Sequence, residues 1–71
     1  MGRTRKGCYA CKGDNGMWGV CEGESGLVYG AIFGKRAAER IAELENSPNP
    51  PPDWRATERI LIGEGLLEEV A

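Results

Sequence analysis

Turn signals and apolar runs alternate in the first half of the chain, which predicts a series of short antiparallel strands. Segments 11–16 and 21–26 repeat one pattern: Cys, a charged residue, Gly, an acid, Asn or Ser, then Gly. Asn-Gly and Ser-Gly pairs favour tight hairpin turns. An apolar run follows each segment, so we expect a β-meander with strands over 17–22 and 27–33. Residues 6–11 are expected to form a first strand, with a metal-binding knuckle as the alternative.

The segment 27–33 is apolar at both odd and even positions. Alternation along a strand places Val28 and Ile32 on one face of the sheet. The opposite face would carry Leu27, Tyr29, Ala31 and Phe33. A helix can cover one of these faces, and an open face or edge invites a second copy of the chain. A homodimer is therefore expected.

The second half of the chain is typical of two helices. Apolar residues recur at helical spacing and predict a helix over 35–46, which the proline-rich connector 47–52 ends. Asp53 is a favourable N-cap for a second helix over 53–64, and Gly65 is a favourable stop, with Leu66 against Leu61. Residues 66–71 are expected to form an extended tail, with a last helical turn or a short strand as alternatives.

These elements predict a single small α+β domain. A basic arm over 1–7 precedes an antiparallel β-meander of two or three strands over 8–33, and two helices follow. The chain has 71 residues, so the core is thin and a staple or a partner chain is often needed at this size. The expected core consists of Trp18, Phe33, Ile41, Leu44, Trp54, Ile60 and Leu61.

Charge is distributed unevenly along the chain. The net charge is -2, yet residues 1–12 carry four basic residues and no acid. Such an arm can favour nucleic acid or an acidic protein surface, and the plainer interpretation is a solvated, frayed end. No apolar segment is long enough for a membrane span or placed as a signal peptide. We therefore expect a cytoplasmic protein without a membrane partner, in the host cytoplasm if it is viral.

Three cysteines are the first candidate site. Cys8 and Cys11 have the spacing of half a zinc site, and Cys21 follows. The chain has no histidine, so a fourth ligand would be Asp14, Glu22 or Glu24, or would come from another chain. An iron–sulfur cluster, a disulfide and free, reduced thiols on the strands are the alternatives. Pairing through a turn at Asp14-Asn15 would place Cys8 opposite Cys21.

The start of the helix over 35–46 is a second candidate site. Lys35 and Arg36 open this helix and Arg40 lies one turn further on, where free backbone N–H groups could bind an anion or a partner. The alternative is a solvated face with the ion pairs Lys35–Glu39 and Arg40–Glu43.

The proline run with its tryptophan is a third candidate site. A segment containing Pro50 and Pro51 can dock on an aromatic groove of a partner, together with Trp54. The alternative is that the run covers the core of its own domain, with Trp54 as the plug. Catalytic chemistry has little support, because the chain lacks histidine, a serine nucleophile motif and a phosphate-binding loop.

Residues 28–46 resemble short, uncharacterised accessory proteins of phages that infect actinobacteria. The resembling positions are Tyr29, Gly30, Phe33, Arg36, Ala37, Ala38, Glu39, Ile41, Ala42, Leu44 and Asn46. The resemblance covers about a quarter of the chain and implies a viral context rather than a mechanism.

Two functions are expected from these patterns. The first is a small, non-enzymatic protein-interaction module, which in the viral context implied by the resemblance would be a phage-encoded modulator of a host protein. The second is a zinc-stabilised nucleic-acid-binding module that uses the basic arm and the helix start. Nucleic acid is the less favoured partner, since four basic residues leave a small phosphate footprint.

Overall fold

The computed structural model describes residues 7–23 and 26–68 and forms the predicted α+β fold. Most of the predicted basic arm, residues 1–6, lies outside these described residues. Three strands precede two helices: β1 (Cys8–Lys12), β2 (Trp18–Glu22), β3 (Gly26–Phe33), α1 (Lys35–Asn46) and α2 (Trp54–Gly63).

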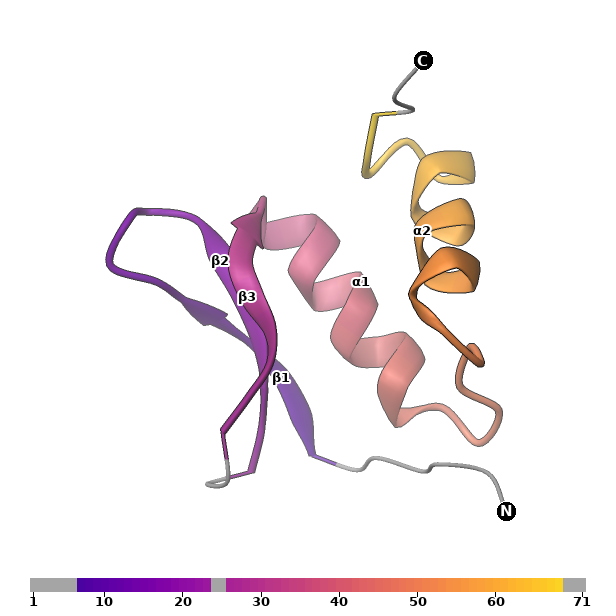
Figure 1. The fold of residues 1–71 in the computed structure, drawn as a ribbon, viewed down its shortest axis with the longest axis horizontal. Helices are drawn as coiled ribbons and strands as arrows, with labels where there is room; N and C mark the ends of the chain where they lie inside the picture. The colour runs from indigo at the N-terminus through magenta and orange to yellow at the C-terminus, as the bar shows by residue number, and fades with distance from the viewer. Residues whose placement is uncertain (1–6, 24–25, 69–71) are drawn as a thin grey trace.

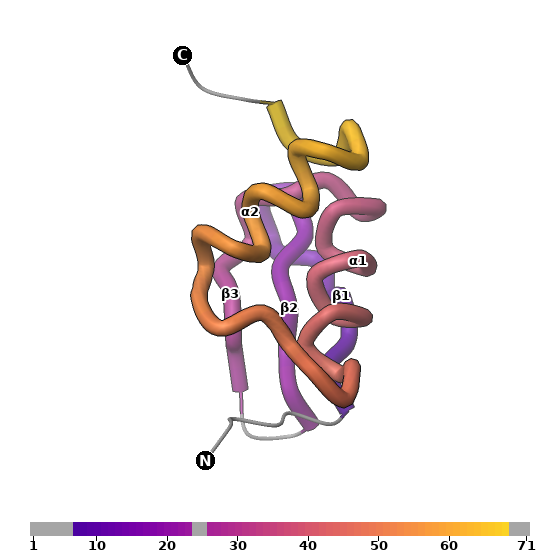
Figure 2. The backbone as a smooth tube through the Cα atoms, turned by 90° about the vertical axis from the view of Figure 1, so that its right-hand side faces the viewer, coloured from indigo at the N-terminus to yellow at the C-terminus, as the bar shows by residue number. Residues whose placement is uncertain are grey.

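The strands form one antiparallel sheet in the order β1-β2-β3. Both helices lie on the same side of this sheet, so the domain has two layers (Figures 1 and 2). We call the sheet face under the helices the covered face and the opposite one the open face. In the described part of the chain, no helix is long and apolar enough to cross a membrane.

The hairpin between β1 and β2 closes through the predicted Asn-Gly turn. The N–H of Gly13 donates to the carbonyl of Met17 at 2.7 Å, and Gly16 has a φ of 83°, which favours glycine. The Asn15 carboxamide accepts from the N–H of Met17 at 2.9 Å and donates to the carbonyl of Ala31 at 3.1 Å. The loop is thereby tied to β3 as well as to its own strands.

The expected alternation along β3 is wrong, because the pairing of β2 with β3 contains two register shifts. Trp18 pairs with Phe33, Val20 with Tyr29, and Cys21 with Leu27. Extra residues on β3 at each shift disturb the regular in-and-out order, as β-bulges do. Val28 and Tyr29 consequently both pack against the core, whereas Leu27 is exposed.

The core lies between the covered face and α1. Ile41 and Leu61 are fully buried and Phe33 nearly so, as predicted. Trp18 and Trp54 are half-buried against this core, while Leu44 and Ile60 are also only half-buried and were predicted too deep. Several other buried residues were absent from the expected core, among them Cys8, Val20, Glu45 and Thr57. Ala37, Ala38 and Ala42, which belong to the expected apolar stripe of the helix, are buried too, and their small size lets α1 approach the sheet closely.

Both ends of α2 follow the predicted chemistry. The Asp53 carboxylate accepts from the N–H of Ala56 at 2.9 Å, as an N-cap does. At the other end the N–H of Leu66 donates to the carbonyl of Leu61 at 2.8 Å, and Gly65 has a φ of 77°. This is the predicted Schellman stop. Residues 66–68 form no strand, and 69–71 lie outside the described part of the chain.

Candidate functional site

The open face carries large apolar side chains that no described residue covers. Tyr9 on β1 is 48% exposed, and Leu27 and Ile32 on β3 are 64% and 72% exposed. Met17, beside the hairpin loop, is 40% exposed. Leu27 pairs with Cys21, which in turn pairs with Tyr9, so a row of uncharged side chains crosses all three strands.

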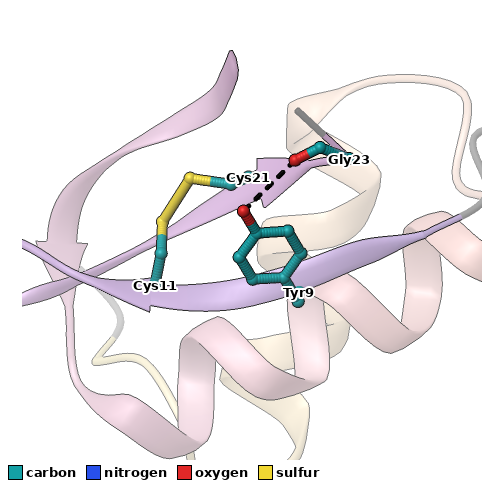
Figure 3. The surroundings of a disulfide bond; sticks show 4 residues. All are labelled: Tyr9, Cys11, Cys21 and Gly23. Atoms are coloured by element: carbon teal, nitrogen blue, oxygen red, sulfur yellow. Dashed lines mark hydrogen bonds between the residues drawn. A yellow bond between two sulfur atoms is a disulfide. The ribbon is translucent and has the colours of Figure 1, made fainter. Parts of the chain in front are cut away.

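A disulfide joins Cys11 to Cys21 on this open face (Figure 3). Cys11 pairs with Gly19 and Cys21 with Tyr9, so the two cysteines are diagonal neighbours whose Cα atoms lie 6.2 Å apart. The Tyr9 hydroxyl donates to the carbonyl of Gly23 at 3.2 Å across the same face (Figure 3). The expectation of free thiols is therefore wrong for Cys11 and Cys21.

Cys8 lies apart from the other two cysteines. It pairs with Glu22 rather than with Cys21, so the predicted hairpin register was displaced by one residue. A displacement of one residue moves side chains to the opposite face. Cys8 lies outside the disulfide, is only 6% exposed, and belongs to the core. Within residues 7–23 and 26–68, no three cysteine or acidic side chains gather as a metal-binding group; Glu24 lies outside this part of the chain.

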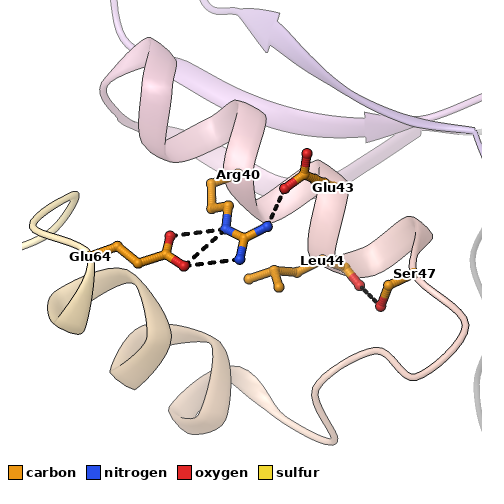
Figure 4. Close-up of polar contacts among 5 residues, drawn as sticks. All are labelled: Arg40, Glu43, Leu44, Ser47 and Glu64. Carbon is orange, nitrogen blue, oxygen red and sulfur yellow. Dashed lines mark hydrogen bonds and ion pairs between the residues drawn. The ribbon is translucent and has the colours of Figure 1, made fainter.

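The three basic residues predicted at the start of α1 do not converge. Lys35 lies over the ring of Trp18, with its Nζ atom 5.5 Å from the ring centroid, while Arg36 is exposed. The Arg40 guanidinium donates from Nε and Nη2 to the Glu64 carboxylate, each at 2.9 Å, and also bonds Glu43 (Figure 4). Arg40 therefore links α1 to the end of α2 instead of facing an anion site.

The Arg40–Glu64 pair also changes the acidity of the carboxylate. Hydrogen bonds from Arg40 hold the pKa of Glu64 below its ordinary value, because they favour the charged form. Both side chains are partly exposed to solvent, at 32% for Arg40 and 38% for Glu64, so the pair holds the end of α2 against α1 rather than forming a buried reactive centre.

Trp54, which follows the proline run, packs against the domain's own core. The Trp54 ring lies 5.3 Å from the ring of Tyr29 and 5.6 Å from that of Phe33, measured between centroids. Pro50 and Pro51 are half-buried in the connector before it. Trp54 therefore packs into its own domain, as the alternative interpretation expected, and its ring contacts Tyr29 and Phe33 rather than facing a partner.

The sequence hinted at the open face but did not identify its residues. The apolar positions on both sides of 27–33 indicated that one face lacks a cover, yet the register shifts decide which side chains lie there. Tyr9 sits between two cysteines and was overlooked as a surface residue. Comparison of the chain with protein-family models, curated proteins and solved structures gives no match to any of them.

Proposed function

We propose that this chain is a non-enzymatic protein-interaction module that binds a partner protein through the open face. The observation that carries this proposal is the exposure of Tyr9 and Leu27, which belong to one row of uncharged side chains across the sheet, together with the exposure of Ile32 further along β3. Large apolar side chains grouped on a small domain cost free energy in water, and such groups mark sites of protein association.

The open face is built as a firm platform. The Cys11–Cys21 disulfide and the Tyr9 hydrogen bond to Gly23 hold β1 and β2 in register beneath the exposed side chains. A rigid surface loses little conformational entropy when a partner docks on it, which favours affinity. The expected partner surface is apolar and uncharged. The resemblance to phage accessory proteins makes a protein of the host cell the first partner to test.

The test compares two variants with the same change in net charge. Leu27→Glu/Ile32→Glu places two carboxylates on the open face, whereas Arg55→Gln/Arg59→Gln changes two exposed positions of α2. Proteins of an actinobacterial lysate retained by the immobilised chain should be lost with the first variant and kept with the second. Circular dichroism should show both variants folded. Equal retention by all three chains would contradict the proposal.

A second copy of the chain is the alternative occupant of the open face. Sedimentation at micromolar concentration distinguishes it, because a dimer that Leu27→Glu/Ile32→Glu dissociates would assign this face to self-association. The zinc-stabilised nucleic-acid alternative has a separate test, namely zinc content together with salt-dependent retention on DNA.

A further inference from the structure

A groove of about 510 Å³ runs between the outer edge of β1 and one stripe of α1. Its β1 wall consists of Cys8, Tyr9 and Ala10, which are consecutive residues. Consecutive strand residues point to opposite faces, so all three can line one groove only if it follows the edge of the strand. The groove is therefore distinct from the open face, and Tyr9 borders both.

The edge of β1 beside this groove has unused capacity for strand pairing. β1 has β2 as its sheet neighbour on one side and no described strand on the other. The Asn46 side chain already occupies the outward N–H and carbonyl of Cys8, at 2.8 and 3.0 Å. Outward-facing backbone groups recur at every second residue of a strand, so those of Ala10 and Lys12 point the same way. An added strand could therefore pair with Ala10 and Lys12, directly after the Cys8 groups that Asn46 occupies.

The α1 wall of the groove is acidic. Glu39 and Glu43 line it, and no basic residue does. Glu43 is bound to Arg40, whereas Glu39 is exposed and makes no ion pair with another described residue. Ala42 lies between them in sequence and, being small, leaves room beside Ala10.

From these three features we propose that the groove binds an extended, lysine- or arginine-containing peptide segment of a partner protein, which adds a strand to β1. The backbone of the bound peptide forms hydrogen bonds with the backbone groups of Ala10 and Lys12. The basic side chains of the peptide that point toward α1 approach Glu39 and Glu43. Main-chain bonds supply affinity in this mode of recognition, and side chains at alternate positions supply specificity. This proposal does not depend on binding at the open face.

The probes are peptides of alternating valine and lysine with both termini blocked. Two such peptides, one beginning with valine and one with lysine, place the lysines on opposite sides of the added strand, and matching valine–glutamate peptides are the controls. At millimolar concentration the lysine peptides should shift the backbone amide signals of Ala10 and Lys12 and slow their hydrogen exchange. The glutamate peptides should leave these signals unchanged. Added salt should weaken binding of the lysine peptides, because the carboxylates are exposed.

Two double variants separate the groove from the overall charge. Glu39→Gln/Glu43→Gln should weaken the lysine peptides about fivefold to tenfold. Asp14→Asn/Glu58→Gln removes the same charge outside the groove and should leave binding unchanged. The proposal is overturned if no lysine peptide shifts the Ala10 and Lys12 amides, or if both double variants bind alike. A dimer of the unmodified chain that Glu39→Gln/Glu43→Gln dissociates would assign the groove to a second copy and would also overturn it.

Discussion

The carboxamide of Asn46, the last residue of α1, binds both backbone polar groups of Cys8, the first residue of β1. Its Oδ1 accepts from the Cys8 N–H at 2.8 Å and its Nδ2 donates to the Cys8 carbonyl at 3.0 Å. The two residues are 38 positions apart in the chain. One side chain thus acts in place of a neighbouring strand and fixes the end of the helix to the edge of the sheet.

Replacing Asn46 should therefore destabilise the domain. Asn46→Ala leaves the two Cys8 groups without their partner and should lower the free energy of unfolding by about 1–3 kcal/mol. Urea denaturation measures this change. Asn49→Ala in the exposed connector is the matched control and should have little effect. Equal stability of the two variants would show that water replaces the Asn46 side chain without loss.

Truncation of core residues should follow their burial. Ile41 is fully buried, so Ile41→Ala should lower the free energy of unfolding by about 2–5 kcal/mol. Leu44 is half-buried and Leu44→Ala should cost less, about 1–2 kcal/mol. Urea or thermal unfolding of the two variants measures the order. A larger loss at Leu44 would contradict the packing of α1 described above.

The disulfide predicts both a thiol count and a stability change. Of the three cysteines only Cys8 lies outside the disulfide, so a thiol reagent should label one cysteine in denaturant without reductant and all three after reduction. Cys11 and Cys21 are 10 residues apart. Closure of a loop this short stabilises a domain by about 2–3 kcal/mol, which Cys11→Ala/Cys21→Ala should remove. Three labelled thiols before reduction would exclude the bond.

Acidification should weaken the link between α1 and α2. The pKa of Glu64 is lower in the folded chain than in the unfolded one, because Arg40 stabilises its carboxylate. A lowered folded-state pKa contributes stability above the ordinary glutamate pKa of about 4.3, and this is lost as the pH falls through the folded value. NMR titration should show a low Glu64 pKa that rises toward the ordinary value in Arg40→Gln. An unchanged Glu64 pKa in that variant would contradict the pairing.

Two glycines that lie in neighbouring strands should respond differently to alanine. A Cβ atom at Gly19 would lie 2.5 Å from the carbonyl oxygen of Tyr29, whereas one at Gly30 would meet nothing within 4 Å. Gly19→Ala should force β2 and β3 apart and lower the free energy of unfolding by about 1–3 kcal/mol. Gly30→Ala should be tolerated. Thermal unfolding compares them, and similar melting temperatures would count against the close approach of the strands.

The helices could be predicted from the sequence because their signals are local. The apolar stripe of α1, the Asp53 cap and the Gly65 stop each act within a few residues, and all three were confirmed. The register of the hairpin between β1 and β2 was harder to predict from the sequence. The N–H of Gly16 bonds the carbonyl of Gly13 around Asp14-Asn15, but the strand pairing closes between Gly13 and Met17. The register is therefore displaced by one residue from the expected one, and this displacement decides which cysteines meet.

The β3 side chains could not be assigned from alternation either. The close passage of β2 at Gly19 and the two register shifts arise from contacts between strands, which a pattern within one strand does not encode. Those shifts determine that Leu27 faces solvent while Val28 and Tyr29 face the core. The open face was therefore visible in the sequence as an excess of apolar positions and not as particular residues.

The register shifts also bear on aggregation. An exposed strand that is flat and regular is a template onto which further copies can add, and bulges disturb such an edge. β3 is the longest strand, at 8 residues, and both shifts lie in its pairing with β2. β1 pairs with β2 without a shift. Growth of a fibril-like sheet is therefore disfavoured at the β3 edge, whereas at the straighter β1 edge Asn46 blocks only the end at Cys8.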